Sequence, residues 1–172
     1  MEYKGKSLTL LSYKPKDQEY LNKALHENPN GVLVCDVLLD ALKEPMAEMI
    51  PYHLTWIIES EGTRLGVLVL QKISHQHQSG ELILIFNDTD FYADQDLIQN
   101  ILTLLTEEIF VGISLIRLQG IVLESHLRLK EAYNNFGFLE EGLLRSKFKV
   151  KDKRYDAYVM SLLKIEWERS KK

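Results

Sequence analysis

The stretch that decides the fold reads Leu123-Glu-Ser-His-Leu-Arg-Leu-Lys-Glu-Ala-Tyr-Asn-Asn-Phe-Gly-Phe-Leu-Glu-Glu-Gly-Leu-Leu-Arg145. Its apolar residues recur at the spacing of a helix that buries one face, at Leu129, Ala132, Tyr133 and Phe136. We expect Ser125 to be the N-cap, because a hydroxyl there can accept a hydrogen bond from a first-turn amide. Gly137 suits the left-handed residue that follows a helix, and Phe138 can then fold back onto the last turn. The stretch therefore predicts a helix with defined ends and one buried face.

Strands are predicted on both sides of this helix. Residues 117–124 alternate between apolar and polar side chains, which is typical of a strand. Two more strands are expected after the helix, at 143–150 and 156–163, with a polar link at 151–154. A strand, a helix and a return strand form a crossover, so the sheet in this half of the chain is predicted to be mixed.

The first half of the chain predicts a strand, two helices and a β section. Residues 7–12 read as a strand, and a helix opened by 14–17 ends at the turn 28–31. Helical spacing at 34–42 favours a second helix before Pro45. Three strands rich in Ile, Val, Leu and Trp then follow at 53–59, 65–72 and 81–86.

Turns at 60–63 and 74–80 connect these three strands as a meander. A polar loop at 87–94 then leads to a helix with an apolar stripe over 97–109. The full order predicts a mixed α/β (α+β) fold, in which a central, mostly antiparallel, twisted sheet of about seven strands carries helices on both faces. We expect a single domain over 1–172, since nothing resembling a linker divides the chain.

Composition narrows the class of protein further. The 172 residues are 45% hydrophobic and 27% charged, which is ordinary for a globular domain. A net charge of −4 gives no overall field to hold nucleic acid or an anionic membrane, so neither is an expected partner. We see no apolar stretch of signal-peptide or membrane-spanning type, and we expect a cytoplasmic protein. For the lone Cys35, in an apolar run, an inert buried thiol is favoured over a catalytic one.

The opening stretch resembles the GNAT superfamily of N-acyltransferases, and most of all the branch that acetylates ribosomal-protein N-termini, spermidine and similar amines. The matching residues are Tyr133, Gly137, Phe138, Glu141, Gly142 and Arg145. The ending 153–167 resembles the last strand and tail of the same branch. The resemblance implies the GNAT fold and an acetyltransferase that moves an acetyl group from acetyl-CoA to a primary amine of a small molecule or a protein N-terminus.

The resemblance also implies catalytic roles for two residues. The family's equivalent of Tyr133 lies beside the thiol of coenzyme A and protonates the leaving thiolate, whereas the helix pattern alone reads Tyr133 as a core tyrosine. Glu81, or a water, is the candidate base for the incoming amine, although a surface carboxylate at the strand end is the simpler interpretation. His75 and His77 lie in the preceding turn, and they can titrate near neutral pH.

By the same resemblance, the pantetheine arm of the cofactor lies in a V-shaped gap between 82–86 and 117–124, like an added strand. The residues expected to contact the cofactor are Leu84, Ile85, Phe86, Tyr92, Ala93, Asp94, Gln95, Asp96 and His126. His126 stands where the family has an asparagine, and a solvent-facing histidine is the favoured alternative. The aromatic residues Tyr155, Tyr158 and Trp167 are candidates for a homodimer interface.

The loop that should hold the cofactor's pyrophosphate departs from the family pattern of Arg/Gln-x-x-Gly-x-Gly/Ala. Residues 87–96 contain no glycine, no lysine or arginine, and four aspartates. Aspartates suit a helix N-terminus as caps, but they repel a pyrophosphate. Their spacing lacks the glycine and glutamate of a calcium loop, so caps are favoured and no metal is predicted.

This departure leaves an alternative function open, a binding or regulatory module that no longer binds coenzyme A. The two functions differ in one feature of the structure. A carboxylate that fills the mouth of the helix after 87–94 favours the module, whereas amides left open there favour the enzyme. Basic residues from elsewhere, such as Arg128, Lys130 or Arg145, are candidates to compensate for the missing positive charge.

Overall fold

The structure is a computed structural model that describes residues 2–4, 8–27 and 53–172. The helix predicted at 34–42 and Cys35 lie outside the described residues. The described residues form one sheet in the order β1-β2-β3-β4-β5-β6-β8-β7. Its strands are β1 (Glu2–Lys4), β2 (Leu8–Ser12), β3 (Leu54–Ser60), β4 (Thr63–Ser74), β5 (Ser79–Phe86), β6 (Arg117–Leu123), β7 (Leu139–Val150) and β8 (Lys153–Leu163).

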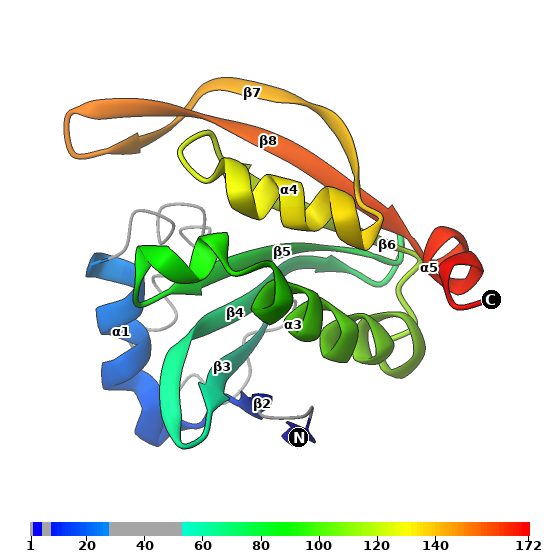
Figure 1. Cartoon of the computed structure of the whole chain (residues 1–172), viewed down its shortest axis with the longest axis horizontal. Coiled ribbons are helices and arrows are strands. Elements are labelled where there is room, and N and C mark those ends of the chain that lie inside the picture. Colours follow the sequence, from blue (N-terminus) through cyan, green and yellow to red (C-terminus); the bar gives the residue numbers. More distant parts are fainter. Residues whose placement is uncertain (1, 5–7, 28–52) are drawn as a thin grey trace.

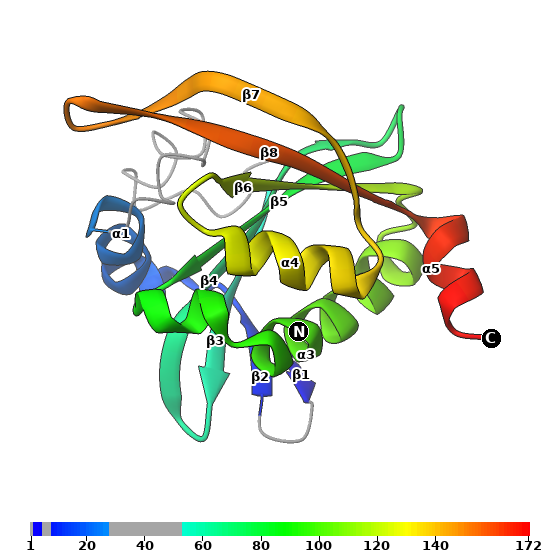
Figure 2. The same ribbon diagram turned by 45° about the horizontal axis from the view of Figure 1, so that its top comes forward.

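The predicted fold class is confirmed: the sheet is mixed and mostly antiparallel, and helices cover both of its faces (Figures 1 and 2). Every pair of neighbouring strands is antiparallel except β5 and β6. The short β1 brings the strands to eight, against about seven expected. The longer helices are α1 (Gln18–Glu27), α3 (Gln95–Glu107), α4 (Leu127–Phe136) and α5 (Lys164–Ser170). None of the helices in the described ranges could cross a lipid bilayer.

Alternation along the strands divides the core between the two faces. On one face, α1 packs Leu21 and Leu25 against residues such as Ile83. On the other face, α3 and α4 cover the neighbouring strand positions, among them Leu82 and Leu84. The sheet therefore separates an α1 face from an α3/α4 face, and this division decides where each side chain of the site points.

Several elements begin or end away from their predicted positions. A short 3₁₀ helix, η3 (Thr89–Ala93), occupies the predicted loop before α3, and a π-helical turn, η4 (Glu108–Gly112), ends α3. Strand β7 ends at Val150 as predicted but begins at Leu139, and β8 begins at Lys153, where Lys149 pairs with Arg154 and Val150 with Lys153. Only residues 151–152 remain as a turn. Charged residues obscured these strand ends, and charge is well tolerated on a β-hairpin at the edge of a sheet.

Strands β5 and β6 diverge and open the gap that the resemblance implied. Their parallel pairing begins at Ser79 with Arg117 and ends at Leu82 with Gly120. Strand β5 then continues to Phe86, paired with β4, while β6 continues to Leu123, paired with β8. Each strand therefore keeps only its outer partner beyond that point. The apex of the V lies at Leu82 and Gly120.

The C-terminal end of α4 is confirmed, whereas its predicted N-cap is wrong. Gly137 has a φ of +113°, and the N–H of Phe138 donates to the carbonyl of Tyr133 at 3.0 Å, which closes the last turn. At the other end the N-cap is His126, one residue after Ser125, and no side chain caps the first turn. The Ser125 hydroxyl instead lies 3.2 Å from Nδ1 of His126, so it is engaged with its neighbour.

A charged cluster joins the last three strands and gives a pH-dependent prediction. Both oxygens of Glu141 accept from the Arg117 guanidinium, and one also accepts from Ser161 Oγ at 2.8 Å. These bonds lower the pKa of Glu141 to about 2. Because a depressed carboxyl pKa stabilises the fold above the unfolded pKa of about 4.3, this contribution is lost as the pH falls toward 2.

We therefore expect Glu141→Gln to lower the free energy of unfolding at pH 7, by about 1 kcal/mol or less, since the pair is partly exposed and screened. At pH 2 the difference in denaturant midpoint between the variant and the wild type should be smaller than at pH 7. Glu131→Gln, which breaks the exposed pair with Arg128, is the control and should change less. An equal loss at both pH values would contradict an ionic role for Glu141.

Candidate active site

Tyr133 lies at the apex of the gap, on the α3/α4 face. Its ring, carried by α4, packs directly on Gly120 of β6, where an added Cβ would come within 2.3 Å of Cε2. The glycine is therefore required by this close approach. Phe138 supports the other side of the ring, with 4.8 Å between centroids. The turn at Gly137 thus positions the tyrosine as well as ending the helix.

The hydroxyl of Tyr133 is fully buried, and it has no hydrogen-bond partner in the part of the chain that the structure describes. Buried tyrosine hydroxyls ordinarily find a partner, and one without a partner indicates that a group belongs there. Burial raises the pKa of Tyr133, and the nearby Tyr92 raises it further. The hydroxyl therefore keeps its proton at physiological pH and is able to donate it in a hydrogen bond.

Tyr92 fills the mouth of the same gap. Its hydroxyl accepts a hydrogen bond from the Phe86 N–H at 3.0 Å, and its ring stands edge-on to the Phe86 ring at 5.0 Å. Successive amides of a strand point to opposite neighbours. The Asn87 N–H donates to Leu65 on the β4 side, so the Phe86 N–H faces the gap. The Tyr92 hydroxyl is thus bonded to the backbone N–H that an added strand would use.

His126 completes this aromatic cluster. Its ring lies 4.1 Å from the Tyr92 ring, and the side chain is half-buried. Burial lowers its pKa, so the ring is neutral at physiological pH. The ring is therefore half-buried against η3 and only partly faces solvent.

A hollow of about 500 Å³ opens where the gap meets the surface. Tyr92 and Ala93 of η3 line one side of it, His126 and Arg128 line the start of α4, and Tyr155 of β8 lines the rim. The structure thus brings together three residues that the sequence predicted as cofactor contacts, Tyr92, Ala93 and His126. We call this space the donor hollow.

The other predicted contacts lie in three different settings. The side chains of Leu84, Ile85 and Phe86 are buried in the core, so only their backbone is placed to line the gap. Gln95 ties α3 to α4, since its side-chain amide donates to the Arg128 carbonyl at 2.9 Å. Asp96 is exposed in the first turn of α3.

The N-terminus of α3 does not fit a pyrophosphate. The Asp94 carboxylate caps the helix by accepting from the Leu97 N–H at 2.9 Å, and Asp88 caps η3 by accepting from the Asp90 N–H at 3.0 Å. A carboxylate therefore fills the position where the phosphates of a nucleotide would bind, and no lysine or arginine stands in 87–96. This end of the gap is therefore unsuited to a phosphate group.

We expect Asp94→Ala to cost about 1 kcal/mol of unfolding free energy, because the substitution removes the cap of α3. For a domain of this size, that loss lowers the thermal midpoint by about 2–4 °C. Asp96→Ala, which removes a nearby carboxylate that is not the N-cap, should have a smaller effect in the same thermal scan. Equal losses in the two variants would show that helix charge, and not capping, is what Asp94 provides.

Glu81 is not a surface carboxylate at a strand end; it is buried within β5 on the α1 face, just before the apex. Its oxygens accept from Gln71 at 2.6 Å, from Lys72 at 2.9 and 3.1 Å and from Gln119 at 3.0 Å. These bonds tie β4, β5 and β6 together where the pairing ends, and they use the oxygens that a general base would need. His75 and His77 are exposed in the turn between β4 and β5.

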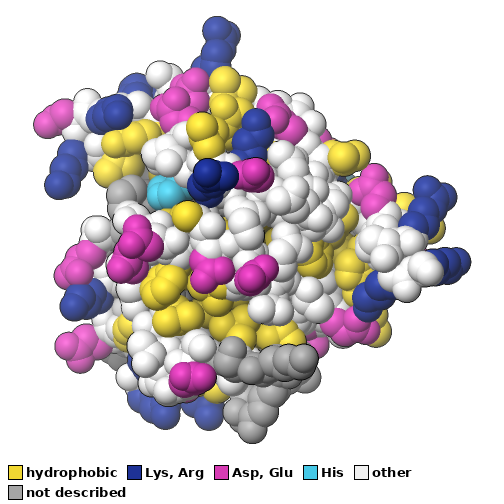
Figure 3. Space-filling model, viewed as in Figure 1, with side chains coloured by type: hydrophobic (Ala, Val, Ile, Leu, Met, Phe, Trp, Pro, Cys, Tyr) yellow, Lys and Arg dark blue, Asp and Glu magenta, His cyan; other side chains and the backbone are white. Residues whose placement is uncertain are grey.

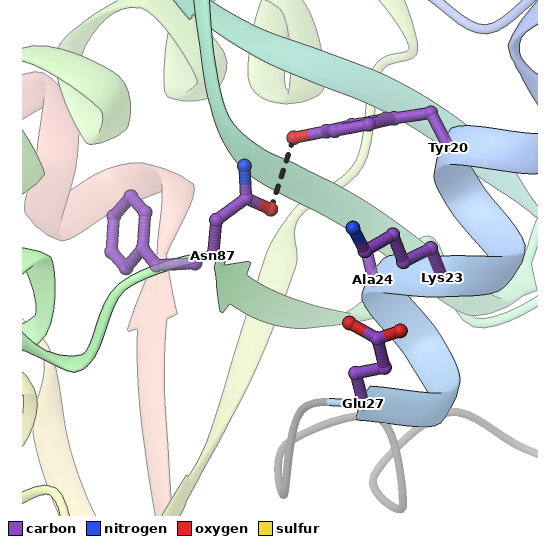
Figure 4. A pocket seen from close by; sticks show the side chains of 6 residues that line it. Tyr20, Lys23, Ala24, Glu27 and Asn87 are labelled. Atoms are coloured by element: carbon purple, nitrogen blue, oxygen red, sulfur yellow. Dashed lines mark hydrogen bonds between the residues drawn. The ribbon is translucent and has the colours of Figure 1, made fainter.

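A second hollow, of about 390 Å³, lies on the α1 side of the same strand end (Figure 4). Tyr20, Lys23 and Glu27 line it from α1, and the Tyr20 hydroxyl donates to Asn87 Oδ1 at 3.1 Å. Phe86 lines this hollow too, while its N–H holds Tyr92 on the other side of the strand. No sequence pattern indicates this hollow, because only the tertiary fold brings α1 against the end of β5.

The basic residues named as compensation are largely engaged elsewhere. Arg128 pairs with Glu131 at 2.9 Å, and Lys130 pairs with Glu140 at 2.7 Å. Lys130 also lies 3.8 Å from the centre of the Tyr158 ring. In the described ranges, no three His, Cys, Asp or Glu side chains gather closely enough to hold a metal ion.

The aromatic tail offers less surface than expected for a homodimer. Trp167 is buried against Phe110, with 5.3 Å between ring centroids, so it belongs to the core of its own chain. Tyr155 and Tyr158 are partly exposed, and lysine side chains lie over both rings. The proposed interface around Trp167 is therefore wrong for that residue.

Comparison with solved structures supports the fold. No family model and no curated protein matches the chain. Among solved structures, a spermidine/spermine N-acetyltransferase SpeG from Vibrio cholerae superposes with a TM-score of 0.82 at 16% identity, covering 98% of this chain and 100% of that one. A dodecameric form of the spermidine N-acetyltransferase from Vibrio cholerae gives 0.80 at 18% identity, with coverage of 98% and 100%. A probable acetyltransferase gives 0.74 at 19% identity, with coverage of 97% and 99%. The splayed strands, the crossover helix and these superpositions together establish that this chain has the GNAT fold.

Proposed function

We propose that the chain is an N-acetyltransferase that transfers an acetyl group from a pantetheine thioester, of the acetyl-CoA type, to a primary amine. The observation that carries the proposal is the buried hydroxyl of Tyr133 at the apex of the gap, for which the described residues supply no partner. The fold likeness to acetyltransferases is consistent with it. A thioester supplies an activated acyl group and a sulfur leaving group.

Tyr133 suits the sulfur side of such a reaction. Negative charge develops on sulfur as the carbon–sulfur bond breaks, and a fixed donor in a dry site stabilises that charge strongly. Because the pKa of Tyr133 is raised, its hydroxyl is a firm hydrogen-bond donor throughout the physiological range. Gly120 and Phe138 fix the ring from both sides, so the donor needs no reorganisation during the reaction.

Glu81 has a supporting part in this proposal. It lies beside the apex on the opposite face of the sheet from Tyr133, but Lys72, Gln71 and Gln119 already donate to its oxygens. We infer that it holds the three strands in register at the apex. The amine then loses its proton to water or arrives unprotonated.

A second candidate function is a GNAT-fold module that binds no coenzyme A. Two contacts favour it, the Asp94 carboxylate at the start of α3 and the Tyr92 hydroxyl on the Phe86 N–H. The unpartnered Tyr133 hydroxyl favours the enzyme instead, because a module without a cofactor gains nothing from burying an unbonded polar group.

The experiment that separates the two functions is a calorimetric titration of the protein with acetyl-CoA at low salt. The transferase should bind at micromolar concentration, and it should then release free thiol when a panel of primary amines is added. Spermidine belongs in the panel because a solved structure of similar fold is a spermidine N-acetyltransferase. No heat up to millimolar acetyl-CoA, from protein shown to be folded, would leave the module as the function.

A further inference from the structure

The arm formed by the facing ends of β7 and β8 carries a charge opposite to that of the whole chain. Residues 145–154 contain six lysines and arginines and one aspartate, although the chain has a net charge of −4. Figure 3 shows dark blue side chains gathered at the upper left, where Figure 1 places this hairpin. Magenta side chains lie below them, on the side of η3 and α3.

The hairpin extends past the open end of the V. Strand β8 runs antiparallel to β6, and the last residue of β6, Leu123, pairs with Ala157. Residues 147–155 therefore project beyond the end of β6, on the side where β5 and β6 have separated (Figures 1 and 2). Tyr155 connects the hairpin to the donor hollow by lining its rim, and Lys153 Nζ lies 4.8 Å from the centre of that ring.

Strand alternation places Lys149 and Arg154 on the face of the hairpin opposite to Phe148 and Tyr155. Phe148 and Tyr155 are register partners and pack toward the core of the α1 face. The next pair, Lys149 and Arg154, must point to the opposite face, which α3 and α4 cover. Tyr158 confirms this parity, since its ring contacts Lys130 of α4.

Three of these residues are available for an anion, and we call Lys147, Lys149 and Arg154 the hairpin cluster. Lys147 and Lys149 are exposed, and no carboxylate pairs with either in the described ranges. Arg154 donates one bond to the Ser146 carbonyl at 3.0 Å, which leaves most of its guanidinium N–H groups for other acceptors. Arg128 and Lys130, in contrast, each pair with a glutamate.

We propose that the hairpin cluster holds the phosphate-bearing end of the acyl donor at the outer rim of the donor hollow. This inference rests on the proposed function, and it names a phosphorylated pantetheine thioester as the ligand class. The Asp94 carboxylate repels phosphate from the α3 side, while the hairpin attracts it on the opposite side of the hollow. Glu124 also lines the hollow, but its Oε1 accepts from the Asp156 N–H at 3.0 Å.

The test compares coenzyme A with pantetheine, which carries the same thiol arm without phosphates, by calorimetry at two salt concentrations. Wild-type protein should bind coenzyme A more tightly than pantetheine, and salt should remove the difference. The triple variant Lys147→Gln, Lys149→Gln, Arg154→Gln should lose about tenfold in affinity for coenzyme A, as expected for three exposed ionic contacts, and nothing for pantetheine.

Two further variants keep the result interpretable. Lys147→Gln with Lys149→Gln leaves the Arg154 bond to Ser146 in place, and it should show a smaller loss of the same kind. Lys16→Gln, Arg169→Gln and Lys172→Gln together remove the same charge from exposed sites elsewhere, and should leave both affinities unchanged.

The same titration is repeated with a phosphopantetheine-bearing carrier protein in place of coenzyme A. If the protein binds only this carrier, and the triple variant does not bind it, the hairpin cluster has the proposed role and the carrier is the acyl donor.

Each other outcome has a defined meaning. Equal affinity for coenzyme A and pantetheine in the wild type would contradict phosphate binding by the hairpin cluster, and the proposed function would still stand. A preference for coenzyme A that the triple variant and the control variant affect equally would also contradict phosphate binding by the cluster. If coenzyme A, pantetheine and the carrier all fail to bind, both the role of the hairpin cluster and the proposed function are contradicted.

Discussion

Tyr133→Phe is expected to slow acetyl transfer by a factor of about 10²–10⁴, the usual contribution of a positioned proton donor, with little change in KM for the acyl donor. The same substitution should raise the stability of the free protein. The Tyr133 hydroxyl is buried and has no partner among the described residues, so deletion removes a desolvated polar group and leaves the packing of the ring on Gly120 and Phe138 intact. We expect a gain of about 1 kcal/mol, or a rise of about 2–4 °C in the thermal midpoint.

The opposite signs of these two effects make the test specific. A purely structural tyrosine would lose stability or change nothing, and a general loss of fold would lower both activity and the thermal midpoint. Tyr158→Phe, on β8 under the Lys130 side chain, is the matched control and should alter neither quantity much. A fall in the midpoint of Tyr133→Phe would mean that the hydroxyl has a partner, and an unchanged rate would remove its catalytic role.

The raised pKa of Tyr133 adds a dependence on alkaline pH to the same comparison. In the unfolded chain a tyrosine ionises near pH 10, whereas the buried hydroxyl stays neutral. The folded protein therefore binds more protons than the unfolded chain above about pH 10, and its stability must fall as the pH rises. Tyr133→Phe should show a shallower fall in denaturant titrations between about pH 9 and 11.

The position of Tyr133 could be predicted from the sequence, because local rules decide it. The apolar spacing of α4, the glycine at 137 and the aromatic residue after it are all properties of one short stretch. Together they place Tyr133 on the buried face and bring Phe138 back against it. Asp94 as a helix cap is a local rule of the same kind, and the structure agrees.

The rest of the site depends on contacts between distant segments, which spacing cannot predict. Glu81 begins the predicted strand 81–86 and is therefore expected at the surface, but strand register places Gln71 and Gln119 beside it, and it is buried. Tyr92 stands among aspartates in a polar loop, and nothing in the loop itself indicates that the ring turns inward. His126 is half-buried, and its contact with the Tyr92 ring joins two segments that are distant in the sequence.

Tyr92→Phe is expected to tighten binding of the acyl donor while it weakens the free protein. The hydroxyl accepts from the Phe86 N–H, so its removal leaves a buried amide unpaired and should lower the free energy of unfolding by about 1 kcal/mol. The phenyl ring keeps the edge-on contact with Phe86. A donor that pairs with the freed amide recovers that energy, which corresponds to about fivefold tighter binding.

Calorimetry with acetyl-CoA and thermal scans in the absence of ligand measure the two effects separately. Tyr20→Phe is the control, because it deletes a tyrosine hydroxyl on the α1 side of the same strand end and should leave donor affinity unchanged. Weaker binding by Tyr92→Phe would show that the hydroxyl contacts the donor directly. Tighter binding would mean that the wild-type gap is held partly closed by its own side chain, since the apparent affinity of a site is reduced by the fraction of molecules in which it is open.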